Sequence, residues 1–457
     1  MSLLADRYAS KAMRDIWSLH NKFVLERELW ILVMKAQSKA GFPIPESTIS
    51  DYERVKNSID IESIDKREAV LRHDVKARIE EFNALAGHES IHLGLTSRDV
   101  TDNVELLQIR DSLRLVLRKS EALLLRLADI SEKYAGLPMV GRTHNVPAQV
   151  TTLGKRFATW AEELLFSTQH CEELLERLPL RGIKGAIGTS LDQNELLGVA
   201  GNQIEGELIS AWGFDSALTS TSQVYPRSID FEVVSTIAQL AAAPSTMATN
   251  IRLMSGLGLL SEGFGKGQVG SSAMPHKVNP RLSERINSLA VILKGFVTMA
   301  AEISGEQWNE GDVSCSAVRR VVLPDSFSAI DAILDTTISV VDSLEIFENE
   351  IKAELHRHLP LLLSTKILML SVKNGVGRER AHELIKDYAR NSSAEEFISA
   401  VSKDLELKID ENELNSLLAN PFVLAGEAPL QARKVAEIIR RDTKISDAKS
   451  YSPQLNN

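Results

Sequence analysis

Apolar residues recur with a helical period over long stretches of the chain. Between residues 103 and 135 there is no glycine or proline. One apolar face is kept there by Leu106, Ile109, Leu113, Leu117, Leu124 and Leu127. A spacing of three or four residues places such side chains on one side of an α-helix. The pattern therefore predicts a long helix over 103–135.

Four further stretches share this pattern, and polar loops separate them. The predicted helices span 155–178, 228–256, 281–304 and 321–347. Pro244 is expected to bend the helix at 228–256, because proline lacks the N–H that a helix interior needs. Alternating, strand-like patterns are nearly absent. The chain is therefore predicted to be all-α, with a central bundle of long helices.

Shorter helical patterns flank this bundle on both sides. We predict an N-terminal helical domain at 1–103, a central long-helix bundle domain at 104–347 and a C-terminal helical domain at 348–457. The last part of the chain, 440–457, is polar, and we expect it to fray.

Composition narrows the possible partners and locations. The 457 residues carry a formal charge of −10, which argues against nucleic acid as the main partner. No apolar run approaches the roughly 18 residues of a membrane span, and Asp6 and Arg7 interrupt the start where a signal peptide would be apolar. Cys171 and Cys315 form neither a disulfide framework nor a metal-ligand motif. A cytoplasmic protein is expected.

A glycine-rich stretch precedes "SSAMPHKVNP". Its sequence "GKGQVG" at 265–270 matches the GxGxxG dinucleotide motif, but that motif has meaning only between a strand and a helix. Here helical sequence precedes it. Clustered glycines instead suit a loop that opens and closes.

Three polar segments lie at the ends of predicted long helices. They are "LRHDVKARIEEFNALAGHESIHLGLTSRDVTDN" at 71–103, "GRTHNVPAQVTTLGKRF" at 141–157 and "TSTSQVYPRSIDFE" at 219–232. Any single Thr or Ser in them is equally well explained as a helix cap. Their recurrence at several helix ends favours a binding site for anions, since helix N-termini attract negative charge.

Three of these motifs together resemble the fumarase/aspartase superfamily. They are "GSSAMPHKVNP", "HLGLTSRDVTDN" and "GRTHNVPAQVTTLGK". Within it the chain most resembles the adenylosuccinate lyase family, through "RYAS", "RHDV", "TSQVYPRSIDFEV" and "SSAMPHK". The resemblance implies a homotetramer of three-domain subunits with active sites shared between subunits. It also implies no metal and no organic cofactor.

The implied activity is release of fumarate in purine nucleotide biosynthesis. The small-molecule nucleotide substrates would be adenylosuccinate, giving AMP, and succinylaminoimidazole carboxamide ribotide, giving the carboxamide ribotide. Such an elimination removes a proton next to a carboxylate, so fixed donors and cations must stabilise the added negative charge. It also protonates the departing nitrogen.

The resemblance assigns roles to individual residues. Ser271 would be the general base and His144 the general acid. A serine needs nearby positive charge to act as a base, for which Lys277 and the helix beginning after Pro280 are candidates. The implied substrate-binding residues are Arg7, Tyr8, Arg72, His73, Asp74, Thr96, Ser97, Gln223, Ser272, Lys277, Asn279, Arg285, Ser316 and Arg320. His92, Thr143 and Glu284 would support them, Glu284 by orienting His144.

One departure from the family pattern concerns Gly311. Many members carry an arginine there, and Arg319 or a residue of another subunit is the expected substitute. Solvated helix charges remain the alternative for Arg285 and Arg320.

Other functions stay open at this point. The alternatives are argininosuccinate lyase, carboxymuconate cycloisomerase and an inactive helical scaffold. The scaffold is disfavoured because Ser271, His144, Lys277 and Asn279 are all present.

Ser97, His144 and Ser271 lie near the ends of different predicted helices. A helix of some 30 residues is about 45 Å long. One chain is therefore not expected to bring all three together, which agrees with sites shared between subunits.

Overall fold

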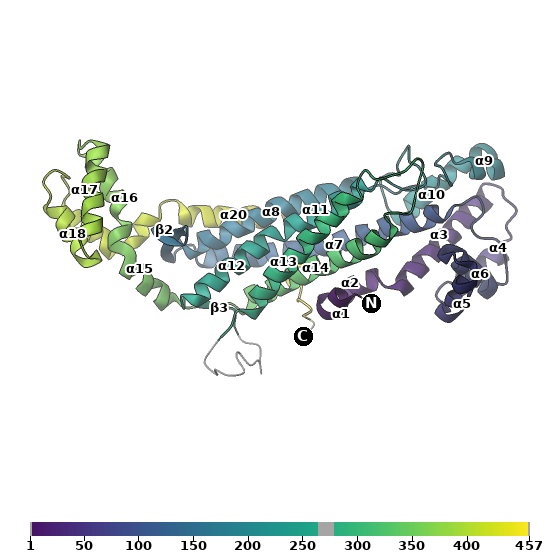
Figure 1. Ribbon diagram of the computed structural model, residues 1–457, viewed down its shortest axis with the longest axis horizontal. Coiled ribbons are helices and arrows are strands. Elements are labelled where there is room, and N and C mark those ends of the chain that lie inside the picture. The colour runs from purple at the N-terminus through teal and green to yellow at the C-terminus, as the bar shows by residue number, and fades with distance from the viewer. Residues whose placement is uncertain (1, 264–277, 456–457) are drawn as a thin grey trace.

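The computed structural model describes residues 2–263 and 278–455 and shows an elongated, mainly helical molecule (Figure 1). Long helices run along its middle, and shorter helices gather at both ends. The strands of the described part form only two small antiparallel pairs. The predicted all-α fold is confirmed. Within the same residues, none of the helices combines the length and apolarity needed to cross a membrane.

The central bundle contains the helices predicted from the sequence. Helix α7 packs against α8, α14 and α20, and α13 packs against α12 and α14. The bounds are Ser97–Lys133 (α7), Leu153–Arg177 (α8), Ser228–Leu240 (α11), Ala242–Gly256 (α12), Arg281–Glu302 (α13), Ser316–Ser343 (α14) and Ala428–Asp442 (α20). The predicted stretches match α7, α8, α13 and α14 one to one, whereas 228–256 is divided into α11 and α12.

This division lies where proline was expected to bend the helix. Helix α11 ends at Leu240, and Pro244 lies in the first turn of α12. Pro244 has no N–H for the carbonyl of Leu240, and its ring crowds that carbonyl. The expected disturbance at Pro244 is confirmed, as an interruption just before it.

The N-terminal helices pack against one end of the bundle (Figure 1). Their bounds are Leu3–Tyr8 (α1), Lys11–Ile16 (α2), Leu19–Lys39 (α3), Glu46–Val55 (α4), Ile61–Leu71 (α5) and Asp74–Ala86 (α6). Trp30 and Phe82 are buried in the same apolar core as the bundle residue Val104. Two buried ion pairs join α3 to α6, Arg27 with Glu81 and Arg78 with Glu26, each at 2.6 Å. They hold the start of α6 in place.

Short elements connect the long helices. The connection between α8 and α11 contains α9 (Leu191–Leu197), a 3-10 helix η1 (Gly198–Asn202) and α10 (Gln203–Trp212). The strand pairs are β1 (Pro138–Thr143) with β2 (Val146–Thr152), and β3 (Leu260–Ser261) with β4 (Glu345–Ile346). The β1–β2 hairpin follows the end of α7.

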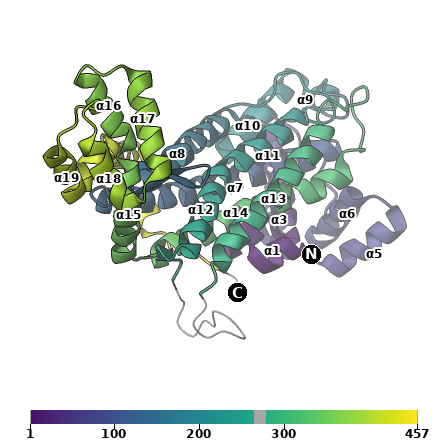
Figure 2. The same ribbon diagram turned by 60° about the vertical axis from the view of Figure 1, so that its left-hand side comes forward.

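Apart from the first of them, whose Leu355 and Leu359 pack with Val140 and Val150 of the β1–β2 hairpin, the C-terminal helices share a core around Phe397, Leu407 and Leu414. They are α15 (Glu348–Leu362), α16 (Ser364–Lys373), α17 (Arg378–Asn391), α18 (Ala394–Lys403) and α19 (Glu411–Ala419), followed by the 3-10 helix η2 (Pro421–Ala425). Figure 2 shows this group standing beside the bundle. The division into three domains stays a prediction, and its boundary at residue 103 falls inside α7.

The polar C-terminal tail does not fray in its described part. After α20, the backbone N–H groups of Lys444 and Ile445 donate to the buried Glu121 on α7, at 3.1 and 2.8 Å. A short 3-10 helix, η3 (Ala448–Ser450), follows, and the Tyr451 hydroxyl donates to Asp335 on α14 at 2.7 Å. The expected fraying is wrong, because buried carboxylates on two bundle helices bind groups of the tail.

Loss of the Tyr451 hydroxyl is expected to weaken this attachment. Asp335 also binds the buried Lys119, at 2.9 Å, and keeps that partner in Tyr451→Phe. The free energy of unfolding, measured in urea, should fall by about 1–2 kcal/mol, the usual cost of a buried hydrogen bond to a charged group. The control is Tyr388→Phe, which removes a more exposed bond to Asp404 and should cost less. Equal losses in both variants would contradict a structural role for the tail.

Candidate active site

Three helices begin around one cavity of about 640 Å³. Helix α6 starts at Asp74, α7 at Ser97 and α14 at Ser316, and all three residues line the cavity. Helix N-termini carry partial positive charge and free N–H groups, so three of them together favour an anion. The cations lining the cavity add to this: Lys22, Arg72, Arg98, Arg319 and Arg320. Carboxylates also line the cavity, and Lys22, Arg98, Arg319 and Arg320 form ion pairs with carboxylates. The three helix N-termini are therefore the main feature that favours an anion here.

Eight residues predicted to bind substrate line this cavity. They are Arg72, His73, Asp74, Thr96, Ser97, Gln223, Ser316 and Arg320. They come from four separate parts of the sequence, and the packing of α6, α7 and α14 brings them together. Their roles in binding stay a prediction. The helix-cap alternative holds for Thr96, the residue before α7, whose N–H donates to the Asp99 carboxylate at 2.8 Å. His73 likewise caps α6, its Nδ1 accepting from the Lys76 N–H at 3.3 Å.

Sequence reasoning missed other residues that line the cavity. These include Lys22, Glu68, Arg98, Thr101, Glu105 and Val313. Three of them, Arg98, Thr101 and Glu105, lie on α7 close to the predicted residue Ser97. Their positions relative to Ser97 along this helix could have identified them. Lys22 had no such signal, because the packing of α3 on α7 brings it within 3.6 Å of Glu105.

A row of carboxylates lies along the first turns of α7, each paired with an arginine from another segment. The pairs are Asp99 with Arg181, Asp102 with Arg227 at 3.1 Å, and Glu105 with Arg319 at 2.8 Å. Residues three apart share one face of a helix. Burial would raise the pKa of Glu105, but Arg319 and neighbouring cations hold that pKa down to about 2. Glu105 therefore stays ionised, and the three pairs tie three segments to the start of α7.

Arg181 holds the backbone near the cavity. Its guanidinium donates to the carbonyls of Gln223 at 2.8 Å, Ser222 at 2.9 Å and Gly185 at 3.0 Å. Asp99 accepts from the N–H of Gly185 at 3.1 Å. The buried pair Asp99–Arg181 thus fixes both the turn at Gly185 and the position of Gln223.

The Gln223 side chain packs against the backbone of Gly311. A Cβ at position 311 would lie 2.7 Å from side-chain atoms of Gln223, so a larger residue would require Gln223 to move. Arg319 was one expected substitute for the missing arginine. Its guanidinium is buried and bound to Glu105 and to Asp230, the latter at 2.6 Å. Arg319 is therefore engaged within the protein, and the more exposed Arg320 is the freer cation of the two.

His92 has a structural contact in one chain. Its Nδ1 accepts from the indole N–H of Trp30 at 3.0 Å, which requires an unprotonated nitrogen. Burial of the ring lowers the pKa of His92 from 6.5 to about 4. His92 lies five residues before α7, and its predicted supporting role stays a prediction.

Acid is therefore expected to destabilise the protein through His92. Between pH 6.5 and 4 the unfolded chain binds a proton that the folded chain does not, so stability falls as the pH falls. A shift from 6.5 to about 4 corresponds to a loss of up to ~3 kcal/mol. In His92→Gln, the urea unfolding free energy should fall less over this range than in the wild type. The control is His170→Gln, which changes an exposed histidine and should keep the pH dependence of the wild type. If stability depended on pH in His92→Gln as steeply as in the wild type, the prediction would be wrong.

His144 lies far from the cavity. It occupies the exposed turn between β1 and β2, whereas Ser97 begins α7. Helix α7 has 37 residues and separates the two. At 1.5 Å per residue its length is about 55 Å. Figure 1 likewise shows β2 and α6 at opposite ends of the bundle. Thr143 lies beside His144, so neither joins the cavity within one chain.

The turn at His144 has an unusual backbone. His144 and Asn145 have φ of 53° and 63°, in the left-handed region. Two successive positive φ values between paired strands are typical of a type I′ turn. Such conformations cost on the order of 1 kcal/mol or more for residues other than glycine, and the surrounding structure must hold them.

Two of the remaining predicted residues, Tyr8 and Arg285, lie side by side. The Arg285 guanidinium lies 5.5 Å from the centre of the Tyr8 ring, next to Arg7 on α1. Glu284 lies in the first turn of α13, and no hydrogen bond or ion pair joins it to His144 within one chain. The predicted orientation of His144 by Glu284 therefore needs a second subunit. Asn279 lies just before α13, whereas Ser271, Ser272 and Lys277 lie outside the described residues.

The start of α13 is already occupied by a carboxylate. Glu262 accepts from the N–H groups of Leu282 and Ser283, at 2.8 and 3.0 Å, and is buried. Its charge neutralises this helix end. The N-terminus of α13 is therefore a weaker candidate for the positive charge that would activate Ser271. Lys277 is the remaining candidate.

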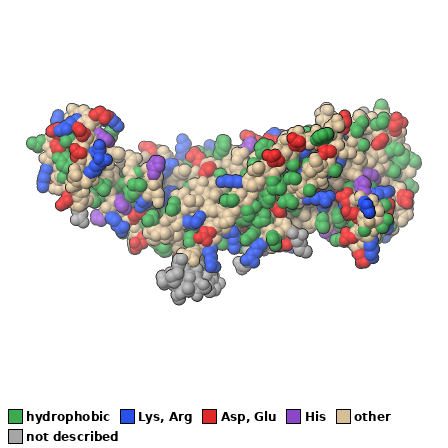
Figure 3. All heavy atoms as spheres, viewed as in Figure 1, with side chains coloured by type: hydrophobic (Ala, Val, Ile, Leu, Met, Phe, Trp, Pro, Cys, Tyr) green, Lys and Arg blue, Asp and Glu red, His purple; other side chains and the backbone are tan. Residues whose placement is uncertain are grey.

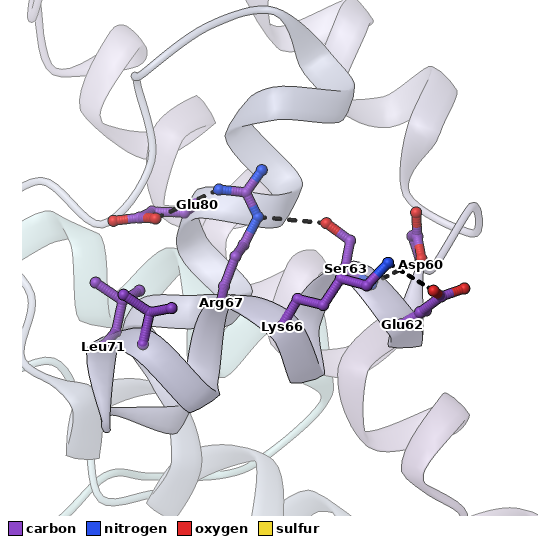
Figure 4. A pocket seen from close by; sticks show the side chains of 8 residues that line it. Asp60, Glu62, Ser63, Lys66, Arg67, Leu71 and Glu80 are labelled. Atoms are coloured by element: carbon purple, nitrogen blue, oxygen red, sulfur yellow. Dashed lines mark hydrogen bonds and ion pairs between the residues drawn. The ribbon is translucent and has the colours of Figure 1, made fainter.

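A second cavity, of about 490 Å³, lies at α5 and α6. Figure 4 shows its charged side chains bound to one another: Lys66 to Glu62, and Arg67 to Ser63 and Glu80. These charges are already paired and exposed. Helix α5 begins beside it and is already capped by the Asp60 carboxylate, which accepts from the Ser63 N–H at 2.9 Å. This cavity therefore offers less to an anionic ligand than the cavity where three helices begin.

Comparison with known proteins identifies the family of the chain. A family model described as "Lyase" matches residues 8–295, and one described as "Adenylosuccinate lyase C-terminus" matches residues 360–435. The chain is 34% identical to adenylosuccinate lyase of Saccharomyces cerevisiae, over 95% of this chain and 93% of that protein. It is 30% identical to adenylosuccinate lyase of Pyrococcus horikoshii, over 95% and 96%.

Solved structures share the fold. A fumarate lyase from Mesorhizobium sp. BNC1 has a TM-score of 0.82 and 22% identity, covering 94% of this chain and 98% of that chain. The 3-carboxy-cis,cis-muconate lactonizing enzyme from Pseudomonas putida has a TM-score of 0.84 and 21% identity, covering 96% and 99%. At this identity the likeness concerns the fold alone.

Proposed function

The chain belongs to the adenylosuccinate lyase family, and from this membership we propose that it cleaves adenylosuccinate to AMP and fumarate. By the same elimination it would release fumarate from succinylaminoimidazole carboxamide ribotide in purine biosynthesis. The observation that carries the proposal is the cavity at three helix N-termini, lined by Arg72, Ser316 and Arg320. A nucleotide phosphate and a succinyl group are anions of the kind that this cavity favours.

The reaction requires a base for the departing proton and an acid for the departing nitrogen. Ser271, deprotonated, would take the proton from the carbon next to a carboxylate of the succinyl group. The C–N bond then breaks, fumarate leaves, and His144 would donate a proton to the departing nitrogen. Cations and N–H groups around the carboxylate stabilise the extra negative charge before the bond breaks. Lys277 and Asn279 are proposed for this role.

We further propose that each site is shared between subunits of a homotetramer. Helix α7, about 55 Å long, separates Ser97 at its start from the hairpin that carries His144, so one chain is not expected to supply both to one site. Large apolar side chains are exposed on α12 and α13, namely Leu253, Leu257, Val291, Ile292 and Met299. Figure 3 shows hydrophobic side chains gathered over the middle of the bundle. Exposed apolar patches of this kind are typical of subunit contacts.

The proposed pathway agrees with a cytoplasmic location.

A spectrophotometric assay tests the activity directly. Purified protein is incubated with adenylosuccinate, with argininosuccinate or with carboxymuconate, and absorbance is followed. Loss of adenylosuccinate with formation of AMP and fumarate supports the proposal. Preference for argininosuccinate or carboxymuconate would assign the chain to a sister reaction, and no reaction with any of them would favour a scaffold.

A further inference from the structure

The conformation of the His144 turn depends on a side chain of the preceding strand. Arg142 donates from Nη1 to the carbonyl of Asn145 at 3.1 Å, which closes the turn from one side. Its Nη2 donates to the carboxylate of Glu354 on α15. One guanidinium therefore bridges the turn and a helix of the C-terminal group.

Glu354 is built into this position. Its side chain is 8% exposed, and its second oxygen, Oε2, is buried with no hydrogen-bond partner among the described residues. Burial of a carboxylate is costly unless a cation pairs with it. The ion pair that the structure gives Glu354 is the one with Arg142, so the carboxylate and the guanidinium fix each other's positions.

The strand ladder does not hold the tip of the hairpin in the usual way. Gly141 pairs with Gln149 and Arg142 with Pro147, so the register shifts by one residue between them. Such a bulge changes the direction of the strand and of its side chains. Pro147, opposite Arg142, has no N–H to donate to the ladder. Thr143 still pairs with Val146 beside the turn, and the side-chain bond from Arg142 adds a link next to the bulge, where Pro147 has no N–H.

We propose that Arg142 and Glu354 are positioning residues for His144. The pair holds the two left-handed residues of the turn in one conformation, so that the imidazole enters the site of a neighbouring subunit in one orientation. This inference rests on the proposed function, in which His144 is the general acid. It adds a residue of α15, far along the chain from the recognised motifs, to the set on which turnover depends.

The test uses Glu354→Gln and Arg142→Lys in the full-length protein. Glutamine removes the charge that fixes the guanidinium, and lysine lacks the fork that reaches both partners. We expect kcat to fall about tenfold with KM within about twofold, because proton donation is misaligned while substrate binding is retained. The controls are Glu350→Gln and Arg357→Lys, exposed positions on the same helix α15, which should change neither.

Rescue separates positioning from simple stabilisation. Glycine is the residue that type I′ turns favour at their second position, so Asn145→Gly should make the turn less dependent on Arg142. The effect of Glu354→Gln on kcat is measured in two backgrounds, the wild type and Asn145→Gly. In the Asn145→Gly background the loss of kcat caused by Glu354→Gln should be smaller. An unchanged kcat in Arg142→Lys, or a loss that glycine does not reduce, overturns the inference. Wild-type activity of His144→Gln would instead overturn the proposed role of His144 itself.

Discussion

His144→Gln and Ser271→Ala are each expected to lower turnover by about two to four orders of magnitude, the range for loss of general acid or base catalysis. Glutamine keeps much of the size and polarity of histidine but cannot donate a proton to a departing nitrogen. Alanine removes the oxygen that would take the proton from carbon. Because His144 is exposed on a turn, its replacement should leave the fold unchanged.

The measurement is kcat with adenylosuccinate, together with the molecular mass and circular dichroism of each variant. His170→Gln and Ser392→Ala are matched controls away from the proposed site and should keep the wild-type rate. If Ser271→Ala retained more than about a tenth of the wild-type rate, the assignment of Ser271 as the base would fall. Wild-type activity in His144→Gln would likewise refute the assignment of His144 as the general acid.

Mixing the two inactive variants is expected to restore activity. If each site takes His144 from one subunit and Ser271 from another, random pairing of equal amounts leaves about a quarter of the sites with both residues intact. The length of α7, about 55 Å, separates the His144 turn from the cavity and is the physical reason for expecting shared sites. Recovery should approach a quarter of the wild-type rate.

The two variants are dissociated, reassociated together and assayed beside each variant treated alone. Subunit exchange is confirmed by tagging one variant and detecting mixed oligomers. No recovery in confirmed mixed oligomers would mean that one chain supplies both residues, and sites shared in this way would then be excluded. A mixture of equal amounts of His144→Gln and Glu354→Gln extends the test. Both changes act on the same turn, so every turn in the mixture carries a lesion, and the activity should be about half that of Glu354→Gln alone.

Much of the bundle was predictable because helical periodicity is a local property. The apolar face from Leu106 to Leu127 predicts α7, and the chemistry of Pro244 predicts the interruption between α11 and α12. The sequence motifs also predicted residues that meet at one cavity, such as Asp74, Ser97 and Ser316. These three begin helices, and helix starts have recognisable residues.

The tail and the supporting ion pairs were not predictable in this way. The polar composition of the tail indicated fraying, but Glu121 and Asp335, on two different helices, bind it. Likewise Arg181 carries no sequence signal that it pairs with Asp99. Such contacts join residues far apart in the chain, and local patterns do not contain them.

By itself, the sequence determined the helical fold class, the long helices and the motifs that identify the family, because periodicity and motif spacing are written along one chain. Only the tertiary structure decided which of those motifs meet. It gathers Asp74, Ser97 and Ser316 at one cavity, leaves His144 at the other end of α7, and joins Arg142 to Glu354. The physical reason is that a rigid helix of 37 residues keeps its two ends apart, whereas packing brings together segments that the sequence separates.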